Sequence, residues 1–268
     1  MPRFFVLLPA FLLLAGGATA QTSVQESPSV PLLRVAAQAS AEEASLLEAP
    51  VYYVVRNRAY VYRRADDEQA YLELGLREPV ILLNASGSRY HIRTQDGVSG
   101  YVDAGSVSNV WIRVSKRKKA VYLYKGTELL MKVPADFGYN PYADKERRGS
   151  NFNPDDWRTP EGTFFVVKKN PHSKFYKAFV LNYPNTEDAE RGLRQGLISQ
   201  AQYNAIVAAE QTFSMPPMTT PLGGMIEIHG DGTGASSNWT QGCVAVHNDQ
   251  MDELWGWVEV GTPVLIER

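Results

Sequence analysis

Short runs in which apolar and polar residues alternate dominate the chain from Pro50 onward. Between residues 50 and 108 the runs VYYVV, YVYR, YLEL, PVILL, YHIRT and VSGYV are separated by turn residues. Strands of this length and spacing are typical of a small β-barrel. Gln95-Asp96-Gly97 predicts a hairpin between the last two runs, because Asp-Gly accommodates the positive φ of a tight turn.

A second β-rich stretch begins near Asn109. Its first runs, WIRVS and AVYLY, flank the four consecutive cations Lys116 to Lys119 and predict a hairpin with a solvated turn at its tip. A last strand is expected over residues 262–266, after a helix that Asn248 can cap. The apolar face of that helix consists of Met251, Leu254, Trp255 and Val258.

Two further helices are predicted between residues 185 and 211. Asn185 or Thr186 can cap the first, and Gly196 can end it. Ser199 and Gln202 form a capping box for the second helix. Its apolar face should pack on the sheet or line a groove, and it consists of Tyr203, Ile206 and Val207.

Residues 1–20 have the pattern of an export signal. Arg3 precedes the apolar run from Phe4 to Ala15, and Ala18-Thr19-Ala20 is the small-x-small pattern of a cleavage site. The run is shorter than the roughly 20 residues that span a bilayer. We therefore expect an exported protein of the periplasm or cell envelope, with no stable membrane span after cleavage.

Residues 21–49 are rich in Ser, Ala, Gln and Glu and predict a flexible tether, in which residues 32–47 could form a weak helix. For the whole chain, 44% hydrophobic and 21% charged residues are ordinary for a globular protein. The formal net charge of −2 argues against a nucleic-acid partner, which would favour a basic surface.

The only cysteine in the chain lies in the stretch from Met225 to Asn248, MIEIHGDGTGASSNWTQGCVAVHN. His229 closes a strand-like run, and we interpret Cys243 and His229 as nucleophile and base, because a thiol needs a nearby imidazole to take its proton. Gln241-Gly242-Cys243 suits a tight turn whose backbone N–H groups could converge on an oxyanion.

The strand-His-Gly segment, a gap of about a dozen residues and Thr-x-Gly-Cys-Val together resemble the catalytic motif of the L,D-transpeptidase (YkuD-type) family, whose members remodel bacterial peptidoglycan. Thr159-Pro160-Glu161-Gly162 is similar to a second segment of that family, so that the resemblance covers roughly residues 109–268. It implies that Cys243 is the acyl-accepting nucleophile and His229 the base. It also implies that the Gly230 carbonyl orients His229 and that the Gly242 and Cys243 amides bind the oxyanion.

Two positions depart from the usual family pattern. Gln241 stands where members usually have His, and Ala245 where they often have Arg. The chain is more similar to a branch with Thr-x-Gly-Cys-Ile/Val-Ala, which includes hydrolases as well as transferases. Residues expected to bind substrate are Gln241, Thr240 and Trp239.

Residues 50–108 resemble a bacterial SH3-like domain. Their aromatic set could line a ligand groove, although core and strand-surface packing is favoured; it consists of Tyr52, Tyr53, Tyr60, Tyr62, Tyr90 and Tyr101. The expected fold is mainly β, an SH3-like small barrel followed by an L,D-transpeptidase-type β-sandwich with inserted helices. The expected divisions are a signal peptide (1–20), a tether (21–49), the SH3-like domain (50–108) and the catalytic domain (109–268).

The resemblance implies an exported, cysteine-dependent L,D-transpeptidase that acts on peptidoglycan stem peptides through a thioester and needs no cofactor and no metal. An alternative is a hydrolase of the same family, either an L,D-carboxypeptidase or an amidase or endopeptidase that releases a peptidoglycan-linked protein or peptide. A non-catalytic cell-wall binding protein is a further alternative.

Two readings from other classes of protein compete for the same stretch. His229, Asp231, Cys243 and His247 are conceivable zinc ligands, although no His-x-x-x-His or Cys-x-x-Cys pair is present. Residues 230–235 fit a loose Gly-x-Gly-x-x-Gly/Ala dinucleotide pattern, but residues 236–239 do not begin a convincing helix, so that an active-site loop is favoured.

Overall fold

The computed structural model describes residues 49–268. The predicted signal peptide, the weak helix over residues 32–47 and all of the tether except Ala49 lie outside the described residues. Among residues 49–268, no helix has both the length and the apolar character needed to cross a bilayer.

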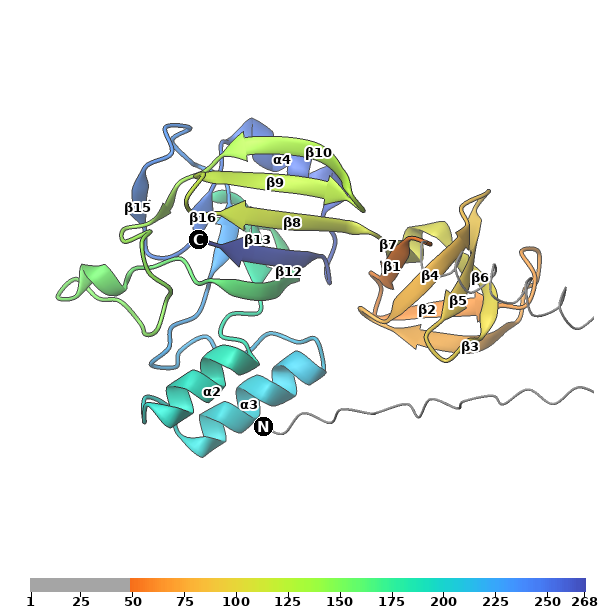
Figure 1. Cartoon of the computed structure of the whole chain (residues 1–268), viewed down its shortest axis with the longest axis horizontal. Helices are drawn as coiled ribbons and strands as arrows, with labels where there is room; N and C mark the ends of the chain where they lie inside the picture. Colours follow the sequence, from red (N-terminus) through yellow and green to blue (C-terminus); the bar gives the residue numbers. More distant parts are fainter. Residues whose placement is uncertain (1–48) are drawn as a thin grey trace, which may run out of the picture. The chain divides into compact units, whose positions relative to one another are not determined.

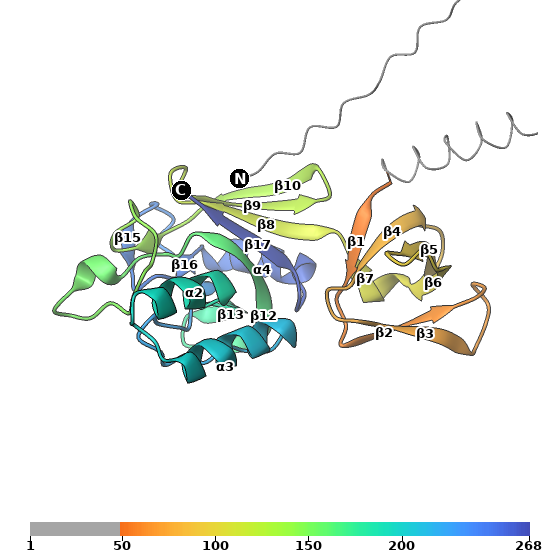
Figure 2. The ribbon, with the colours of Figure 1, turned by 60° about the horizontal axis from the view of Figure 1, so that its bottom comes forward.

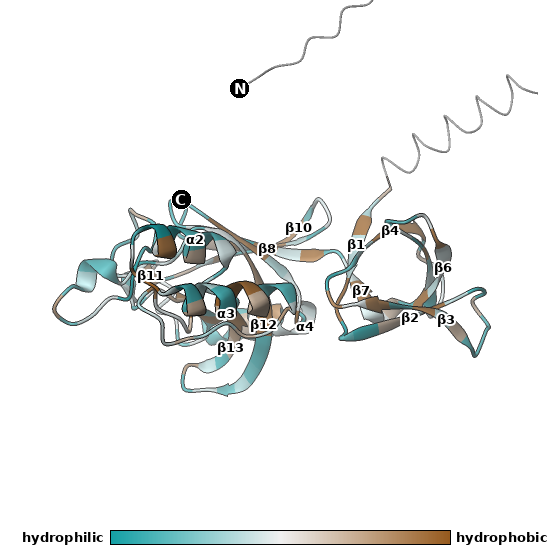
Figure 3. Cartoon of the chain, turned by 90° about the horizontal axis from the view of Figure 1, so that it is seen from below, coloured by the Kyte–Doolittle hydropathy of each residue, from teal (hydrophilic) through white to brown (hydrophobic). Residues whose placement is uncertain are grey.

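The first part of the described chain is a seven-stranded antiparallel sheet, whose strands carry both apolar and polar segments in Figure 3. Its strands are β1 (Val51–Val54), β2 (Arg58–Tyr62), β3 (Ala70–Gly75), β4 (Pro79–Asn84), β5 (Arg89–Thr94), β6 (Ser99–Asp103) and β7 (Val107–Ser108), with the short 3-10 helix η1 (Ala104–Ser106) before β7. The strand order is β3-β2-β6-β5-β4-β1-β7. Each predicted run therefore falls in a strand.

The buried apolar residues of these strands form one core cluster. Ala59 and Val61 of β2 are buried while Tyr60 between them is 44% exposed, as the period of two requires. The predicted hairpin is confirmed, since Gly97 has φ +87° and its amide donates to the Thr94 carbonyl at 3.0 Å. The likeness of this unit to an SH3-like domain stays a prediction.

The second part is an eight-stranded sheet of order β10-β9-β8-β17-β12-β13-β14-β16. Figure 1 shows β10, β9 and β8 as neighbours at one edge of this sheet. Its strands are β8 (Val110–Ser115), β9 (Ala120–Lys125), β10 (Glu128–Pro134), β12 (Gly162–Ser173), β13 (Tyr176–Leu181), β14 (Glu227–His229), β16 (Val244–Ala245) and β17 (Pro263–Glu267). The start of β12 pairs with β17 and the rest with β13, so this long strand joins the two halves of the sheet. The predicted mainly β sandwich with inserted helices is confirmed.

Smaller elements complete this part. Strands β11 (Phe137–Gly138) and β15 (Asn238–Thr240) pair in parallel, and the 3-10 helix η2 (Pro154–Asp156) lies in the long loop before β12. Helix α4 (Asn248–Trp257) buries Met251 and Leu254 in the core, as predicted. Its N-cap is His247, one residue before the predicted Asn248, whose side chain instead accepts from the Asp231 amide at 2.6 Å.

Helices α2 (Thr186–Arg194) and α3 (Gln200–Gln211) lie side by side in Figures 1 and 2. The predicted capping box of α3 is present, and Asn185, one of the two predicted caps, is the N-cap of α2. Gly196 follows α2 with φ +68°, as expected of a helix-ending glycine. The prediction that the second helix packs on the sheet or lines a groove is wrong. Ile206 of α3 packs instead with Ala189 of α2 and with Leu222, in a small core of their own.

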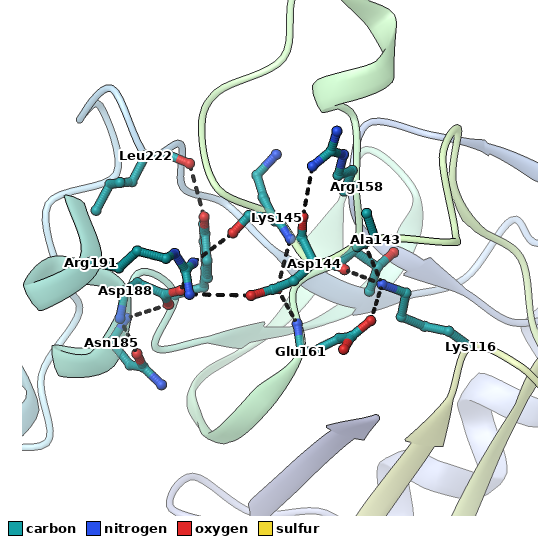
Figure 4. Close-up of polar contacts among 12 residues, drawn as sticks. Lys116, Ala143, Asp144, Lys145, Arg158, Glu161, Asn185, Asp188, Arg191 and Leu222 are labelled. Carbon is teal, nitrogen blue, oxygen red and sulfur yellow. Dashed lines mark hydrogen bonds and ion pairs between the residues drawn. The ribbon is translucent and has the colours of Figure 1, made fainter. Parts of the chain in front are cut away.

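The hairpin between β8 and β9 is confirmed by the pairing of Ser115 with Ala120, but its turn is not solvated throughout. Lys116 is only 2% exposed, whereas Lys118 is exposed. The Lys116 ammonium donates to the carbonyls of Ala143 at 2.6 Å and Thr159 at 3.1 Å and to Glu161 at 2.8 Å (Figure 4). Burial was missed because the acceptors come from a segment distant in sequence.

We predict that Lys116→Met destabilises the fold by about 3 kcal/mol, because it leaves buried carbonyls and the Glu161 carboxylate without their donor. The matched variant Lys118→Met, in the same turn, should change the free energy of unfolding by less than about 0.5 kcal/mol. Urea denaturation measures both. Equal stabilities of the two variants would show that the buried ammonium contributes nothing to the fold.

Candidate active site

A pocket of ≈ 650 Å³ collects the residues on which the sequence interpretation centred. Of the predicted site residues, the pocket is lined by Cys243, His229, Gln241, Thr240 and Trp239. The remaining walls come from the loop before β12, the end of β12 and the segment before β14. Gly230 and Gly242 do not line the pocket but flank the two central residues in sequence.

A parallel strand pair brings Cys243 and His229 to one place. Strand β14 pairs with β16 in the register Ile228 to Val244 and His229 to Ala245. His229 ends the first strand and Cys243 directly precedes the second, so both lie at this pairing. Ile228 and Val244 belong to the main core, which fixes the position of both strands. The apolar run Met225, Ile226 and Ile228 predicts a strand that starts at Met225, but Met225 has φ +54°, is 51% exposed and lies outside β14.

His229 is held in one orientation and one tautomer. Its side chain is buried, and Nδ1 lies 2.6 Å from the Gly230 carbonyl oxygen. A carbonyl only accepts, so Nδ1 carries the proton and Nε2 has the free lone pair. Phe175 stacks on the ring with centroids 4.4 Å apart, and the Trp239 ring meets it edge-on at 6.3 Å.

The acid-base properties of the two groups follow from burial. Burial lowers the pKa of His229 below its ordinary value, although the Gly230 carbonyl opposes the shift, and the imidazole is therefore neutral at pH 7. Cys243 is half-buried, and desolvation of its thiol, with the Glu227 carboxylate adding to it, raises the pKa of Cys243 to about 12. Among residues 49–268, the hydrogen-bond acceptor of this thiol is the Met225 carbonyl, at 3.4 Å from Sγ. The resting pair is thus a thiol and a neutral imidazole.

The turn that carries Cys243 is pinned by a buried hydroxyl. Thr240 Oγ1 donates to the Cys243 carbonyl at 2.7 Å and accepts from the Gly242 amide at 3.2 Å. Gly242 has φ +128°, and a Cβ at this position would lie 2.6 Å from the Arg158 carbonyl oxygen. Only glycine fits there. The Gly242 amide already donates to Thr240 Oγ1. Among residues 49–268 no acceptor is found for the Cys243 amide, so this amide is the one that can donate to a bound ligand.

Asp136 organises the loop between His229 and Cys243 and was missed by sequence reasoning. Its carboxylate accepts from the Thr233 amide at 2.6 Å, the Ser237 amide at 2.8 Å and Trp239 Nε1 at 2.8 Å. Burial alone would raise the pKa of Asp136, but these donors outweigh it and hold the pKa below its usual range. The loop is about a hundred residues away in sequence, so no local pattern points to the contact.

The geometry does not favour the dinucleotide site or the zinc site that the sequence left open. The loop of residues 230–237 leads into strand β15, not into the helix that a dinucleotide site requires. Among residues 49–268, no three His, Cys, Asp or Glu side chains gather closely enough to hold a metal ion. His247 lies at the cap of α4, where Nδ1 is 2.6 Å from Asp249, and it does not line the pocket.

Several pocket residues had not been singled out from the sequence. They include Lys145, Arg148, Lys174, Phe175 and Glu227. Glu227 was hidden inside an apolar strand, and the two cations of the loop before β12 lie in a polar stretch without periodicity. Their nearness to Thr-Pro-Glu-Gly was the available signal.

Comparison with known proteins identifies a family for residues 109–266. The family model of the L,D-transpeptidase catalytic domain (YkuD) matches residues 109–266. No curated protein matches significantly. Bd1075 of Bdellovibrio bacteriovorus is similar at 22% identity, over 60% of this chain and 47% of that one, with a TM-score of 0.37.

Two further similar structures are L,D-transpeptidases. The one from Xylanimonas cellulosilytica shares 16% identity over 60% of this chain and 61% of that one, with a TM-score of 0.35. The one from Mycobacterium smegmatis shares 16% over 78% of each chain, also with a TM-score of 0.35. The chain thus spans less than two thirds of the Bdellovibrio and Xylanimonas structures. Because the family model alone covers more than half of the sequence, this chain belongs to the L,D-transpeptidase (YkuD) catalytic domain family.

Proposed function

We propose that this protein is an exported, cysteine-dependent enzyme that modifies peptidoglycan stem peptides by an L,D-transpeptidase reaction. The observation that carries the proposal is the meeting of Cys243 and His229 on one pocket, with the imidazole held by the Gly230 carbonyl. The proposed domains are an SH3-like unit at residues 50–108, which would bind the cell wall, and the catalytic unit at residues 109–268.

The first half-reaction begins from the neutral pair. His229 Nε2 takes the proton of the Cys243 thiol as Sγ attacks the carbonyl carbon of a stem-peptide residue, so the carbon–sulfur bond forms while the carbonyl becomes an oxyanion. The imidazolium then returns the proton to the departing amine. The carbon–nitrogen bond breaks, and a thioester remains on Cys243.

Backbone groups would stabilise the oxyanion. The Cys243 amide is the main donor in this proposal, and the Gly242 amide contributes if it turns from Thr240 Oγ1, from which it lies 3.2 Å. Gln241 then acts through the shape of the turn. Its exposed side chain and those of Trp239 and Thr240 lie at the pocket, where substrate would contact them.

The second half-reaction decides the product. An amine from a second stem peptide, deprotonated by His229, gives transpeptidation and regenerates the thiol. Water in the same position would give hydrolysis, including release of a peptidoglycan-linked protein or peptide. Both routes pass through the same thioester on Cys243.

The acyl-enzyme is the first test of this proposal. Incubation with purified muropeptides should add an acyl mass to the wild-type chain, which Cys243→Ala removes completely and EDTA leaves unchanged. His229→Gln should slow acylation by about a hundredfold or more, because the thiol loses its base. Intact-protein and muropeptide mass spectrometry measure both, and activity lost with EDTA but restored by zinc would favour a metal hydrolase instead.

Protonation of the thiol gives a second prediction. The Glu227 carboxylate contributes to the raised pKa of Cys243, so Glu227→Gln should lower that pKa and increase the thiolate fraction. The rate of alkylation by iodoacetamide at pH 8 should rise about three- to tenfold, since one pKa unit is a tenfold change in thiolate. Glu253→Gln, an exposed position on α4, is the control and should leave the rate unchanged. An unchanged rate in Glu227→Gln would remove the carboxylate from the electrostatics of the site.

Gln241 provides the third prediction, because a backbone role and a side-chain role differ in magnitude. Gln241→Ala keeps every backbone donor and should cost no more than about tenfold in acylation rate, whereas loss of an oxyanion donor typically costs about a hundred- to a thousandfold. Gln241→His should shift the ratio of cross-linked to hydrolysed products. A thousandfold loss in a folded Gln241→Ala enzyme would mean that the amide side chain itself takes part in the chemistry.

A further inference from the structure

Lys145 places a buried ammonium at the wall of the active-site pocket. The residue is 3% exposed yet lines the same pocket as Cys243 and His229. Its Nζ donates one hydrogen bond, to the Asp156 carbonyl at 3.1 Å. Among residues 49–268, no carboxylate lies within salt-bridge distance of this ammonium. An ammonium has three donors, so Lys145 retains capacity to bind an anion.

The backbone of Lys145 is held from both sides, as Figure 4 shows. Its amide donates to Asp144 Oδ1 at 2.6 Å, and its carbonyl accepts from Arg191 Nη2 at 2.7 Å. Arg191 also pairs with Asp144 at 3.2 Å and with the buried Asp188 at 2.6 Å. Arg158 donates to the Asp144 carbonyl at 3.1 Å. This network fixes the start of the lysine side chain before any ligand arrives.

Gly223 leaves room for the rest of that side chain. A Cβ at Gly223 would lie 3.0 Å from Lys145 Cε, closer than most real contacts. Gly223 has φ +107°, a conformation that other residues rarely adopt. The aliphatic stem of Lys145 therefore passes against a bare backbone on its way to the pocket.

The charges around Lys145 favour an anion in this pocket. The other cations that line it are Arg148, which is occupied with the Thr220 and Met218 carbonyls, and the exposed Lys174. Glu227 is the lining carboxylate. Burial lowers the pKa of Lys145 to about 8; a thiolate at Cys243, once formed, and the Asp156 carboxylate oppose the shift, and Arg148 and Arg158 add to it. At pH 7 most of the population carries the positive charge.

We propose that the Lys145 ammonium is the specificity group of the pocket and binds a carboxylate of the acyl-donor peptide next to the bond that Cys243 attacks. The identity of the ligand, a carboxylate of the acyl-donor peptide, rests on the proposed function. The presence of an anion site at Lys145 does not depend on it. A fixed ammonium in a pocket of low exposure binds a carboxylate more strongly than a surface lysine does, because its desolvation is already complete and charge-assisted bonds are strong.

Paired alkylation of Cys243 tests the anion site without any peptide. Iodoacetate and iodoacetamide both react with the thiolate, so the ratio of their rates cancels any change in the pKa of Cys243 and reports only attraction of the carboxylate. In Lys145→Met the iodoacetate-to-iodoacetamide ratio should fall about tenfold relative to the wild type at pH 7. Lys174→Met, the exposed cation of the same pocket, should change the ratio less than about twofold.

A measurement on the wild type covers the case in which Lys145→Met does not fold. N-Acetyl-D-alanine should protect Cys243 from iodoacetamide, whereas N-acetyl-D-alanine amide at the same concentration should not. Protection should weaken as the pH rises through about 8 and Lys145 loses its charge. Equal protection by the acid and the amide would overturn the proposal.

The outcomes separate this inference from the proposed function. If iodoacetamide and iodoacetate slow equally in Lys145→Met, the lysine acts on the thiol and not on a substrate anion, and the proposal is overturned. If the ratio falls but no muropeptide acylates Cys243, the anion site stands and the peptidoglycan substrate is wrong. If both hold, an acyl donor whose carboxylate is amidated should react with an increased KM in the wild type and be insensitive to Lys145→Met.

Discussion

The parallel pairing of β14 with β16 is the constraint on which the site depends. It sets His229 beside Ala245 in register and so brings the cysteine that precedes β16 to the imidazole that ends β14. Both strands are short, and their place is fixed by the core through Ile228 and Val244. The long loop between them has a defined shape beside the pocket, because Asp136 accepts hydrogen bonds from its Thr233 and Ser237 amides. A one-residue slip of this register would turn the side chains of one strand to the opposite face of the sheet, and His229 and Cys243 would no longer meet.

Polar side chains also fix the loop before β12, which forms another wall of the pocket. The Lys116 ammonium and the Arg191 guanidinium bind backbone carbonyls of the segment that leads to Lys145, and carboxylates accompany both cations. Buried charges are costly unless they are paired and hydrogen-bonded. The buried Lys116 meets both conditions, and the half-buried Arg191 is paired with Asp144 and Asp188. The loop before β12 therefore keeps a defined shape without a strand or helix of its own, which is what a preorganised anion subsite requires.

The protonation states give the site its character. The thiol and the imidazole are both neutral at rest, because burial disfavours the charged form of each. Activation of the thiol in the proposed mechanism is therefore coupled to attack on the substrate and does not precede it. A thiol that is protonated at rest reacts slowly with adventitious electrophiles, because the thiolate is the nucleophile.

The sequence by itself determined the strands of residues 50–108, the β8–β9 hairpin, the turn at Gly97 and the capping box of α3, and it singled out Cys243 and His229, because period-two alternation, Asp-Gly turns, capping boxes and a family motif are encoded within a few residues. Tertiary structure alone decided the packing of α3 on α2, the burial of Lys116, the role of Asp136 and the presence of Lys145 in the pocket. The physical reason is the range of the contacts. Asp136 is 103 residues from Trp239, and a polar residue whose partners lie that far away looks in sequence like any other solvated side chain.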